Sequence, residues 1–176
     1  LCTTDDPVDS LEHHIAISKD PAFDVKVFPA FRPDAGINIE AKGFSSWIAK
    51  LEKVVGIEIK SFEDLKNALR KRIDFFHSVG CRISDHGMDP LVYRESKEEA
   101  AKSIFKKALN GNELTQIEIE IYKTQIMLFL GREYSRLGWV MQLHAGTIRN
   151  TNQKMMELIG PNTGYDTIGD RSFAEP

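Results

Sequence analysis

The chain has 176 residues, of which 41% are hydrophobic and 28% are charged, and its formal net charge is -3. These values are ordinary for one soluble globular domain. The 23 Lys and Arg residues do not exceed the 26 Asp and Glu residues, so the sequence lacks the basic excess that nucleic-acid binding requires. No apolar run approaches the roughly 20 residues of a membrane-spanning helix and no signal peptide opens the chain. We therefore expect a cytoplasmic protein without nucleic-acid or membrane partners.

Four apolar runs are typical of β-strands, because each ends in a charged or imidazole cluster that a Gly or Pro then closes. Parallel strands that carry chemistry at their carboxyl ends have this pattern. The four segments are Cys2-Thr3-Thr4-Asp5-Asp6-Pro7, Val25-Lys26-Val27-Phe28-Pro29-Ala30-Phe31-Arg32-Pro33-Asp34, Cys81-Arg82-Ile83-Ser84-Asp85-His86-Gly87 and Trp139-Val140-Met141-Gln142-Leu143-His144-Ala145-Gly146. The predicted strands are an N-terminal one that ends near residue 5, and 24–31, 81–86 and 139–144.

Helices are predicted between these strands from apolar residues that recur every three or four positions. Ser61 with Asp64, and Ser96 with Glu99, have the spacing of a capping box at a helix N-terminus. The first helix is expected to open with an Asp or Ser cap, and the last to end at Gly160. The predicted helices occupy 9–17, 43–55, 61–78, 96–109, 113–136 and 150–159.

Strands joined by purely helical connections indicate an α/β protein with a parallel sheet. A closed (β/α)8 TIM barrel has eight strands, and this chain has four, so 1–176 is expected to form a single partial TIM-barrel domain, about half of a barrel. A helical insertion is expected at about 36–78. Both ends, including the approach to a further helix at 171–176, have the character of chain interior. If the chain is complete, the alternative is an open doubly wound α/β sheet, because half a barrel leaves strand edges unpaired.

His144 and Arg32 are the strongest candidates for chemistry. His144 ends an apolar strand and precedes two small residues, so its imidazole has room to exchange protons near neutral pH. Arg32 lies at a strand end before Pro33, where its planar guanidinium suits a carboxylate or sugar hydroxyls. The alternatives are a packed structural histidine and a structural ion pair from Arg32 to Asp34 or to carboxylates of another loop.

Four further residues are weaker candidates. Asp85 and His86 are neighbours, so on a strand they point to opposite faces and at most one can face the site. We expect one of them to shape the loop. Asp5 and Asp6 could bind a metal, although paired acids before a proline are more often turn and helix-cap residues. The sequence contains no phosphate-binding glycine loop, nucleophile elbow or Cys/His metal spacing.

Five motifs, in order and at matching spacing, resemble those of the uronate isomerase (glucuronate isomerase) family. They are Thr3-Thr4-Asp5-Asp6-Pro7, Phe31-Arg32-Pro33-Asp34, Gly80-Cys81-Arg82-Ile83-Ser84-Asp85-His86-Gly87, Trp139-Val140-Met141-Gln142-Leu143-His144-Ala145-Gly146 with Arg149-Asn150, and Gly160-Pro161-Asn162-Thr163-Gly164-Tyr165-Asp166-Thr167-Ile168-Gly169-Asp170. The resemblance covers essentially the whole chain. It implies a (β/α)8 barrel of the metal-dependent hydrolase type, in the amidohydrolase superfamily, with these strands as the second through the fifth.

The resemblance also implies an activity and two residue roles. The family interconverts D-glucuronate with D-fructuronate, and D-galacturonate with D-tagaturonate, by proton transfer between C2 and C1. Arg32 corresponds to the family's active-site arginine and His144 to its active-site histidine. Both are thereby implied to bind substrate, and His144 to be catalytic, while the weaker candidates take supporting places.

A divalent metal, zinc or manganese, is implied in the intact enzyme, with ligands that lie outside this chain. A homo-oligomer acting on a small uronate sugar is implied as well. Two alternatives remain at this stage. One is a metal-dependent hydrolase on the same barrel, which would use a metal-bound water. The other is an inactive fragment, since the metal site cannot assemble from this chain alone.

Overall fold

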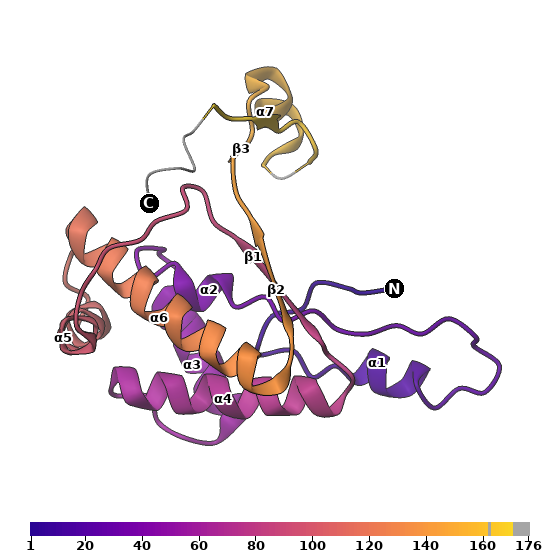
Figure 1. Ribbon diagram of the computed structural model, residues 1–176. Helices are drawn as coiled ribbons and strands as arrows, with labels where there is room; N and C mark the ends of the chain where they lie inside the picture. The colour runs from indigo at the N-terminus through magenta and orange to yellow at the C-terminus, as the bar shows by residue number, and fades with distance from the viewer. Residues whose placement is uncertain (162, 171–176) are drawn as a thin grey trace.

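The computed structural model describes residues 1–161 and 163–170. The segment 171–176, where the sequence indicates the approach to a further helix, lies outside the described residues, as does Asn162 of the last family motif. Figure 1 shows α2 to α6 gathered on one side of the two longer strands, while α7 stands apart from this layer. The elements are α1 (Glu12–Ile17), α2 (Asp34–Ile37), α3 (Phe44–Val55), α4 (Phe62–Ser78), β1 (Ile83–Gly87), α5 (Glu98–Leu109), α6 (Gln116–Leu137), β2 (Val140–His144), β3 (Thr147–Ile148), α7 (Gln153–Ile159) and β4 (Thr167–Ile168).

A parallel sheet forms the centre of the structure. β1 and β2 pair in parallel, with Gly87 opposite His144. Two earlier segments extend the sheet through isolated parallel bridges, which join Phe31 to Ser84, Asp5 to Phe31 and Cys2 to Phe28. The order across the sheet is therefore the N-terminal segment, the segment around Phe31, β1 and β2. The prediction of an α/β protein with parallel strands and helical connections is confirmed.

The second predicted strand is shorter than expected. Within 24–31, bridges form only at Phe28 and Phe31, and Val25 is exposed. Pro29 has no backbone N–H and cannot donate toward β1. The first bond on that side comes from the Phe31 N–H to the Ile83 carbonyl, at 3.1 Å. A continuous strand over 24–31 is therefore not formed.

All six predicted helices are present, and they differ from the prediction mainly at their N-termini. Ser61 caps α4, because its hydroxyl accepts a hydrogen bond from the Asp64 N–H at 3.1 Å. The cap predicted for α5 is wrong: its N-cap is Lys97, which makes no side-chain cap bond. The Ser96 hydroxyl instead accepts a bond from a glutamine side chain of α6, 29 residues further along the chain. Competition from this tertiary contact explains the difference.

Two helix starts differ from the sequence prediction. α6 begins with a capping box that the prediction lacks, in which the Glu118 carboxylate accepts the Thr115 N–H at 2.7 Å. α1 begins after Leu11, a buried residue in the left-handed region at φ 55, and not after an Asp or Ser cap. Packing of this leucine into the core therefore decides where α1 begins.

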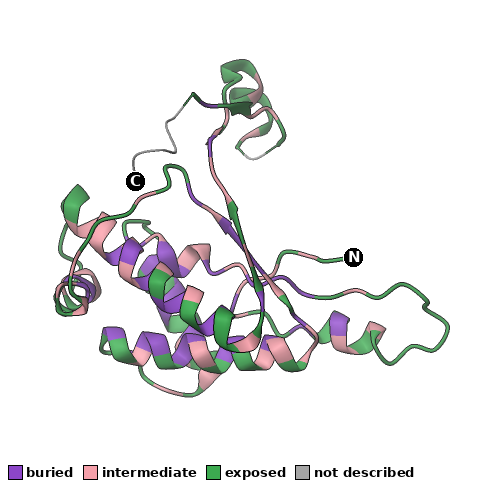
Figure 2. Ribbon diagram, in the orientation of Figure 1, coloured by how far each residue is buried: buried purple, intermediate pink, exposed green. Residues whose placement is uncertain are grey.

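The helices bury their apolar sides against one face of the sheet. Phe31 is fully buried, and its ring lies 5.0 Å from that of Phe76, 6.2 Å from Tyr134 and 6.1 Å from Trp139. Figure 2 shows buried residues concentrated where the helical layer meets the sheet. Because side chains alternate along a strand, the strand residues next to Phe31 face the other side of the sheet.

Beyond β2 the chain forms a small unit, whose helix the sequence predicts and whose two short strands it does not. β3 pairs antiparallel with β4, and α7 lies between them in the chain. Asn152 caps α7 by accepting the Met155 N–H at 3.1 Å, and Gly160 follows the helix as predicted. None of the helices in the described part of the chain has the length and hydropathy needed to cross a membrane.

Candidate active site

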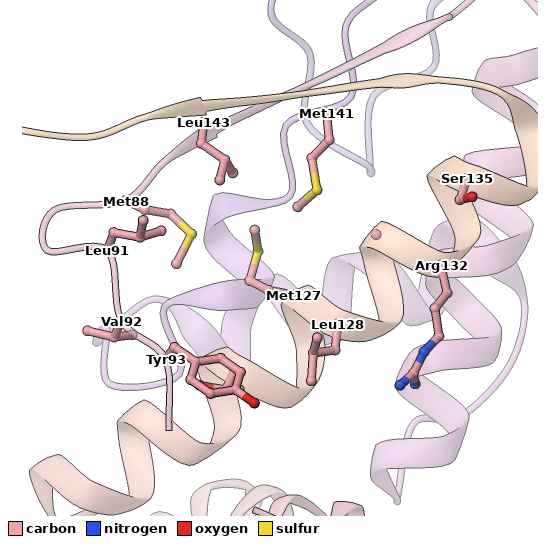
Figure 3. Close-up of a pocket in the computed structure, with 12 residues that line it drawn as sticks. Met88, Leu91, Val92, Tyr93, Met127, Leu128, Arg132, Ser135, Met141 and Leu143 are labelled. Atoms are coloured by element: carbon pink, nitrogen blue, oxygen red, sulfur yellow. The ribbon is translucent and has the colours of Figure 1, made fainter. Parts of the chain in front are cut away.

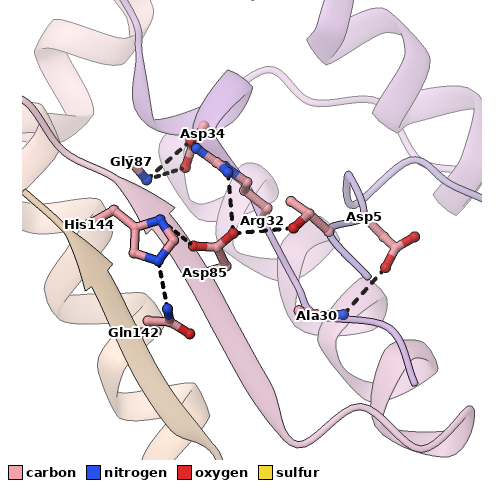
Figure 4. Close-up of polar contacts among 9 residues, drawn as sticks. Asp5, Ala30, Arg32, Asp34, Asp85, Gly87, Gln142 and His144 are labelled. Atoms are coloured by element: carbon pink, nitrogen blue, oxygen red, sulfur yellow. Dashed lines mark hydrogen bonds and ion pairs between the residues drawn. The ribbon is translucent and has the colours of Figure 1, made fainter. Parts of the chain in front are cut away.

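Alternation along the strands separates polar from apolar side chains. His86 is fully buried against the helical layer, where its ring lies 5.6 Å from that of Tyr134. Its neighbour Asp85 points to the opposite face, so only one of the two faces the site, as the sequence predicts. Arg32 and His144 project from the adjacent strand ends onto this same face (Figure 4). Three strand ends thereby bring three ionisable side chains together.

Asp85 contacts both of the strongest sequence candidates. Its Oδ2 accepts a hydrogen bond from Arg32 Nη1 at 3.2 Å, and its Oδ1 lies 3.2 Å from His144 Nδ1. The Thr4 hydroxyl also donates to Oδ2, at 3.4 Å. The Asp85 side chain is only 8% exposed, so these contacts are weakly screened by solvent. The sequence ranks Asp85 below the other two, whereas the structure places it between them.

Arg32 is held in place by two carboxylates. Its Nε donates to Asp34 Oδ2 at 2.8 Å, and the same oxygen accepts the Gly87 N–H at 3.2 Å. A Cβ at position 87 would lie 2.7 Å from Arg32 Nη2, so a larger residue there would displace the guanidinium. Burial by itself lowers the pKa of Arg32, but the hydrogen bond and charge of Asp34, together with Asp85, outweigh it and raise the pKa. The guanidinium is thus permanently charged and still 29% exposed, open to an anion.

His144 is oriented from both sides of its ring. Gln142 Nε2 lies 2.6 Å from His144 Nε2, and Asp85 Oδ1 faces Nδ1. With the Gln142 amide nitrogen toward the ring, Nε2 is the acceptor and the ring hydrogen lies on Nδ1, the nitrogen that faces Asp85. The His144 side chain is 42% exposed. An imidazole held by a carboxylate and open at one side is suited to proton transfer.

Asp5 and Asp6 are used for local structure. Asp5 Oδ2 accepts from the Thr3 hydroxyl at 2.6 Å, and Asp6 Oδ1 accepts from Trp47 Nε1 at 2.8 Å and from the Val8 N–H at 3.0 Å. Burial raises the pKa of Asp6. Within the described residues, no group of three or more His, Cys, Asp or Glu side chains could hold a metal ion. These contacts favour the interpretation of Asp5 and Asp6 as turn residues over their interpretation as metal ligands.

The burial of His86 predicts that acid destabilises the protein. Burial lowers the pKa of this histidine from 6.5 to about 4. The unfolded chain therefore binds more protons than the folded one between these values. We expect the free energy of unfolding to fall as pH drops from about 6.5 to about 4, by on the order of 3 kcal/mol from this residue.

The check is the shift of the denaturation midpoint of the full-length protein between about pH 7 and about pH 4.5. His86→Gln should show a smaller shift than the wild type. The control is His13→Gln, because the His13 side chain is 88% exposed. Equal shifts in the wild type and the His86 variant would contradict the prediction.

Two cavities flank the strand ends. A polar cavity of about 640 Å³ is lined by Arg32, Asp34, Asp89 and Arg149, among others. An apolar cavity of about 590 Å³ lies between β2 and α6, against Met141 and other apolar residues (Figure 3). Because the residues that β2 contributes to it alternate with Gln142 and His144, the apolar cavity lies on the opposite face of β2 from the polar cluster.

Sequence reasoning left out two of the contacts that orient the cluster. Gln142 precedes His144 by two positions, so strand periodicity alone places both on one face. Asp34 entered only as the partner in an alternative structural ion pair, and that ion pair exists. The signal for Gln142 was therefore available in the sequence, while the joint contact of Asp34 with Arg32 and Gly87 depends on the fold.

These features define an α/β protein whose parallel strands carry an Arg–Asp–His cluster at their carboxyl ends, where proteins of this class bind ligands. A family model described as glucuronate isomerase matches residues 1–176. The chain belongs to the glucuronate isomerase family.

Sequence and structural relatives agree with this assignment. The chain is 56% identical over 174 residues to a uronate isomerase of Caldanaerobacter subterraneus subsp. tengcongensis, covering 99% of this chain and 37% of that protein. It is 51% identical to a uronate isomerase of Caldicellulosiruptor saccharolyticus, covering 99% of this chain and 38% of the relative.

Two crystal structures share the fold. The uronate isomerase of Thermotoga maritima has a TM-score of 0.87 and 35% identity, covering 97% of this chain and 38% of that one. The glucuronate isomerase of Caulobacter crescentus has a TM-score of 0.85 and 27% identity, covering 99% and 36%. The chain thus spans less than two-fifths of the length of these relatives.

Proposed function

We propose that this chain is part of a uronate isomerase that interconverts D-glucuronate with D-fructuronate, and D-galacturonate with D-tagaturonate. The observation that carries the proposal is the cluster of Arg32, Asp85 and His144 at the carboxyl ends of three parallel strands. It occurs in a chain whose whole length matches the family. The substrate carries a carboxylate and several hydroxyls, and the cluster offers a partner to each.

Arg32 binds the substrate carboxylate or a hydroxyl in this proposal. A guanidinium forms paired hydrogen bonds to a carboxylate, and its charge does not depend on pH in the working range. Asp34 and Asp85 hold two of its nitrogens, and the side chain remains 29% exposed. This arrangement fixes the direction of the guanidinium before the substrate arrives, so less conformational entropy is lost on binding.

His144 orients a substrate oxygen or moves a proton in this proposal. An aldose–ketose isomerisation transfers hydrogen between C2 and C1 through an enediol, and protons must also reach and leave the oxygens. When the imidazole takes up a proton, the ring becomes cationic. Asp85, 3.2 Å from Nδ1, stabilises that charge and keeps the ring in one tautomer. Asp85 therefore acts as a positioning residue for both neighbours.

A closed (β/α)8 barrel of the amidohydrolase type, in which these four strands are the second through the fifth, is the proposed fold of the whole protein. Two exposed positions of the edge strand support it, since Val140 is 62% and Leu143 42% exposed on β2. Such an edge is normally paired or covered. Further strands would pair with β2, and the helices between them would cover the apolar cavity shown in Figure 3.

The divalent metal implied by the family, zinc or manganese, belongs to the proposal for the whole protein. The described residues do not supply a set of ligands for it. Its ligands would lie outside this chain. A cytoplasmic location and a homo-oligomeric state are proposed on the same family grounds.

The proposal is tested by incubating the full-length protein with D-glucuronate and with D-galacturonate in separate reactions. Proton NMR should show the matching keto sugar appear at the expense of each aldose. D-glucose, which lacks the carboxylate, is the control and should react far more slowly. Hydrolysis of amide or ester substrates without any sugar isomerisation would contradict the proposal and favour the hydrolase alternative.

A further inference from the structure

The loops that follow β1 and β2 are joined by an aspartate outside the Arg–Asp–His cluster. Asp89 Oδ1 accepts the Gly146 N–H at 2.6 Å and the Thr147 N–H at 3.1 Å, 57 and 58 residues away along the chain. One residue earlier, the Met88 N–H donates to the His144 carbonyl at 2.9 Å. The loop after β1 therefore holds the backbone directly at and beyond His144.

This connection bears on the His144 side chain because it fixes the backbone from which the ring extends. β2 ends at His144, and the next ladder pair, Thr147 with Ile168, joins the chain to β4 and not to β1. Gly146 is buried in the left-handed region at φ 86, and its carbonyl accepts the Gly169 N–H at 2.7 Å. The Asp89 carboxylate supplies two bonds that tie this turn to the loop after β1, the strand that carries Asp85.

We propose that Asp89 is a positioning residue for His144, which keeps the imidazole in register with Asp85 by holding the turn after β2. This inference rests on the proposed function for its catalytic consequence. Asp89 acts through the backbone and touches neither the ring nor the cluster. A charged acceptor suits this place, because one carboxylate oxygen bonds two successive N–H groups and such bonds are stronger than neutral ones.

The experiment uses the full-length protein with Asp89→Ala, Asp89→Asn and Asp20→Ala. Asparagine keeps an acceptor oxygen and alanine does not. Asp20 is the matched control, because its carboxylate also accepts a backbone N–H in an exposed turn, that of Ala22 at 2.9 Å. Two readouts are taken: kcat and KM with D-glucuronate, and the rate at which diethyl pyrocarbonate modifies His144, followed by mass spectrometry without substrate. The exposed His13 is the internal reference.

Asp89→Ala should lower kcat by about tenfold with KM changed less than about twofold, since a displaced catalytic group costs rate more than binding. Modification of His144 should rise by about tenfold, because the freed turn releases the ring from its partners, while His13 is unaffected. Asp89→Asn should recover most of both values, and Asp20→Ala should match the wild type.

An unchanged modification rate of His144 in Asp89→Ala would overturn the inference, whatever the activity. A loss of kcat that Asp20→Ala shares would overturn it as well. If the wild-type protein does not isomerise uronates, the proposed function fails, and the modification rates still decide whether Asp89 positions His144.

Discussion

Replacement of Asp85 by asparagine is expected to lower kcat/KM for D-glucuronate by about a hundred- to a thousandfold, the range for loss of an oriented acid–base group. The carboxylate accepts from Arg32 on one oxygen and faces His144 Nδ1 with the other. An asparagine offers only one acceptor oxygen, so it can serve one neighbour and must present an amide N–H to the other. It also removes the negative charge that stabilises an imidazolium.

The measurement is steady-state kinetics of the full-length enzyme, with circular dichroism to establish that the variant is folded. Asp74→Asn is the matched control, because Asp74 pairs with Arg136 at 2.6 Å on the surface, away from the cluster. That variant should behave as the wild type, since exposed ion pairs contribute little. An Asp85→Asn enzyme with more than about half of the wild-type kcat/KM would exclude a role for Asp85 in this chemistry.

Replacement of Arg32 by methionine is expected to raise KM for D-glucuronate by about a hundredfold, and replacement of His144 by asparagine to lower kcat by about a hundredfold or more with a smaller effect on KM. Methionine keeps much of the apolar length of arginine but cannot bind a carboxylate. The preference for D-glucuronate over D-glucose should therefore collapse in Arg32→Met and persist in His144→Asn.

Arg136→Met is the matched control for the first variant. Arg136, like Arg32, bonds two carboxylates, those of Asp74 and Glu133, but it does so on the surface. Its replacement should leave KM and the preference for uronates unchanged. An Arg32→Met enzyme that still prefers D-glucuronate to D-glucose as strongly as the wild type would mean that another residue binds the carboxylate.

Strand periodicity accounts for most of what could be predicted about the site. The sequence places His144 and Arg32 at strand ends and separates Asp85 from His86 by face, and the structure agrees on each of these points. The sequence does not reveal that the Asp85 carboxylate contacts both Arg32 and His144. These contacts join residues that are 53 and 59 positions apart in the chain. Residues so far apart in the sequence come into contact only when the strands pair in register.

The N-termini of the helices show a second limit to what the local sequence predicts. The capping motif at Ser61 works as local chemistry predicts, since Asp64 is its neighbour in the next turn. The motif at Ser96 does not form a cap, because the serine hydroxyl accepts a hydrogen bond from a glutamine side chain of α6. Local rules therefore hold where no distant group competes for the same atom.

The sequence by itself determined the parallel α/β class, the family resemblance and the candidates Arg32 and His144, because apolar periodicity and short motifs are properties of neighbouring residues. Tertiary structure alone decided that Asp85 lies between them and that Asp89 holds the turn beyond His144. Both depend on the parallel register of β1 and β2, which sets Gly87 opposite His144 and so brings one loop against the other. Register follows from the packing of a whole face against the helices, and no single segment encodes it.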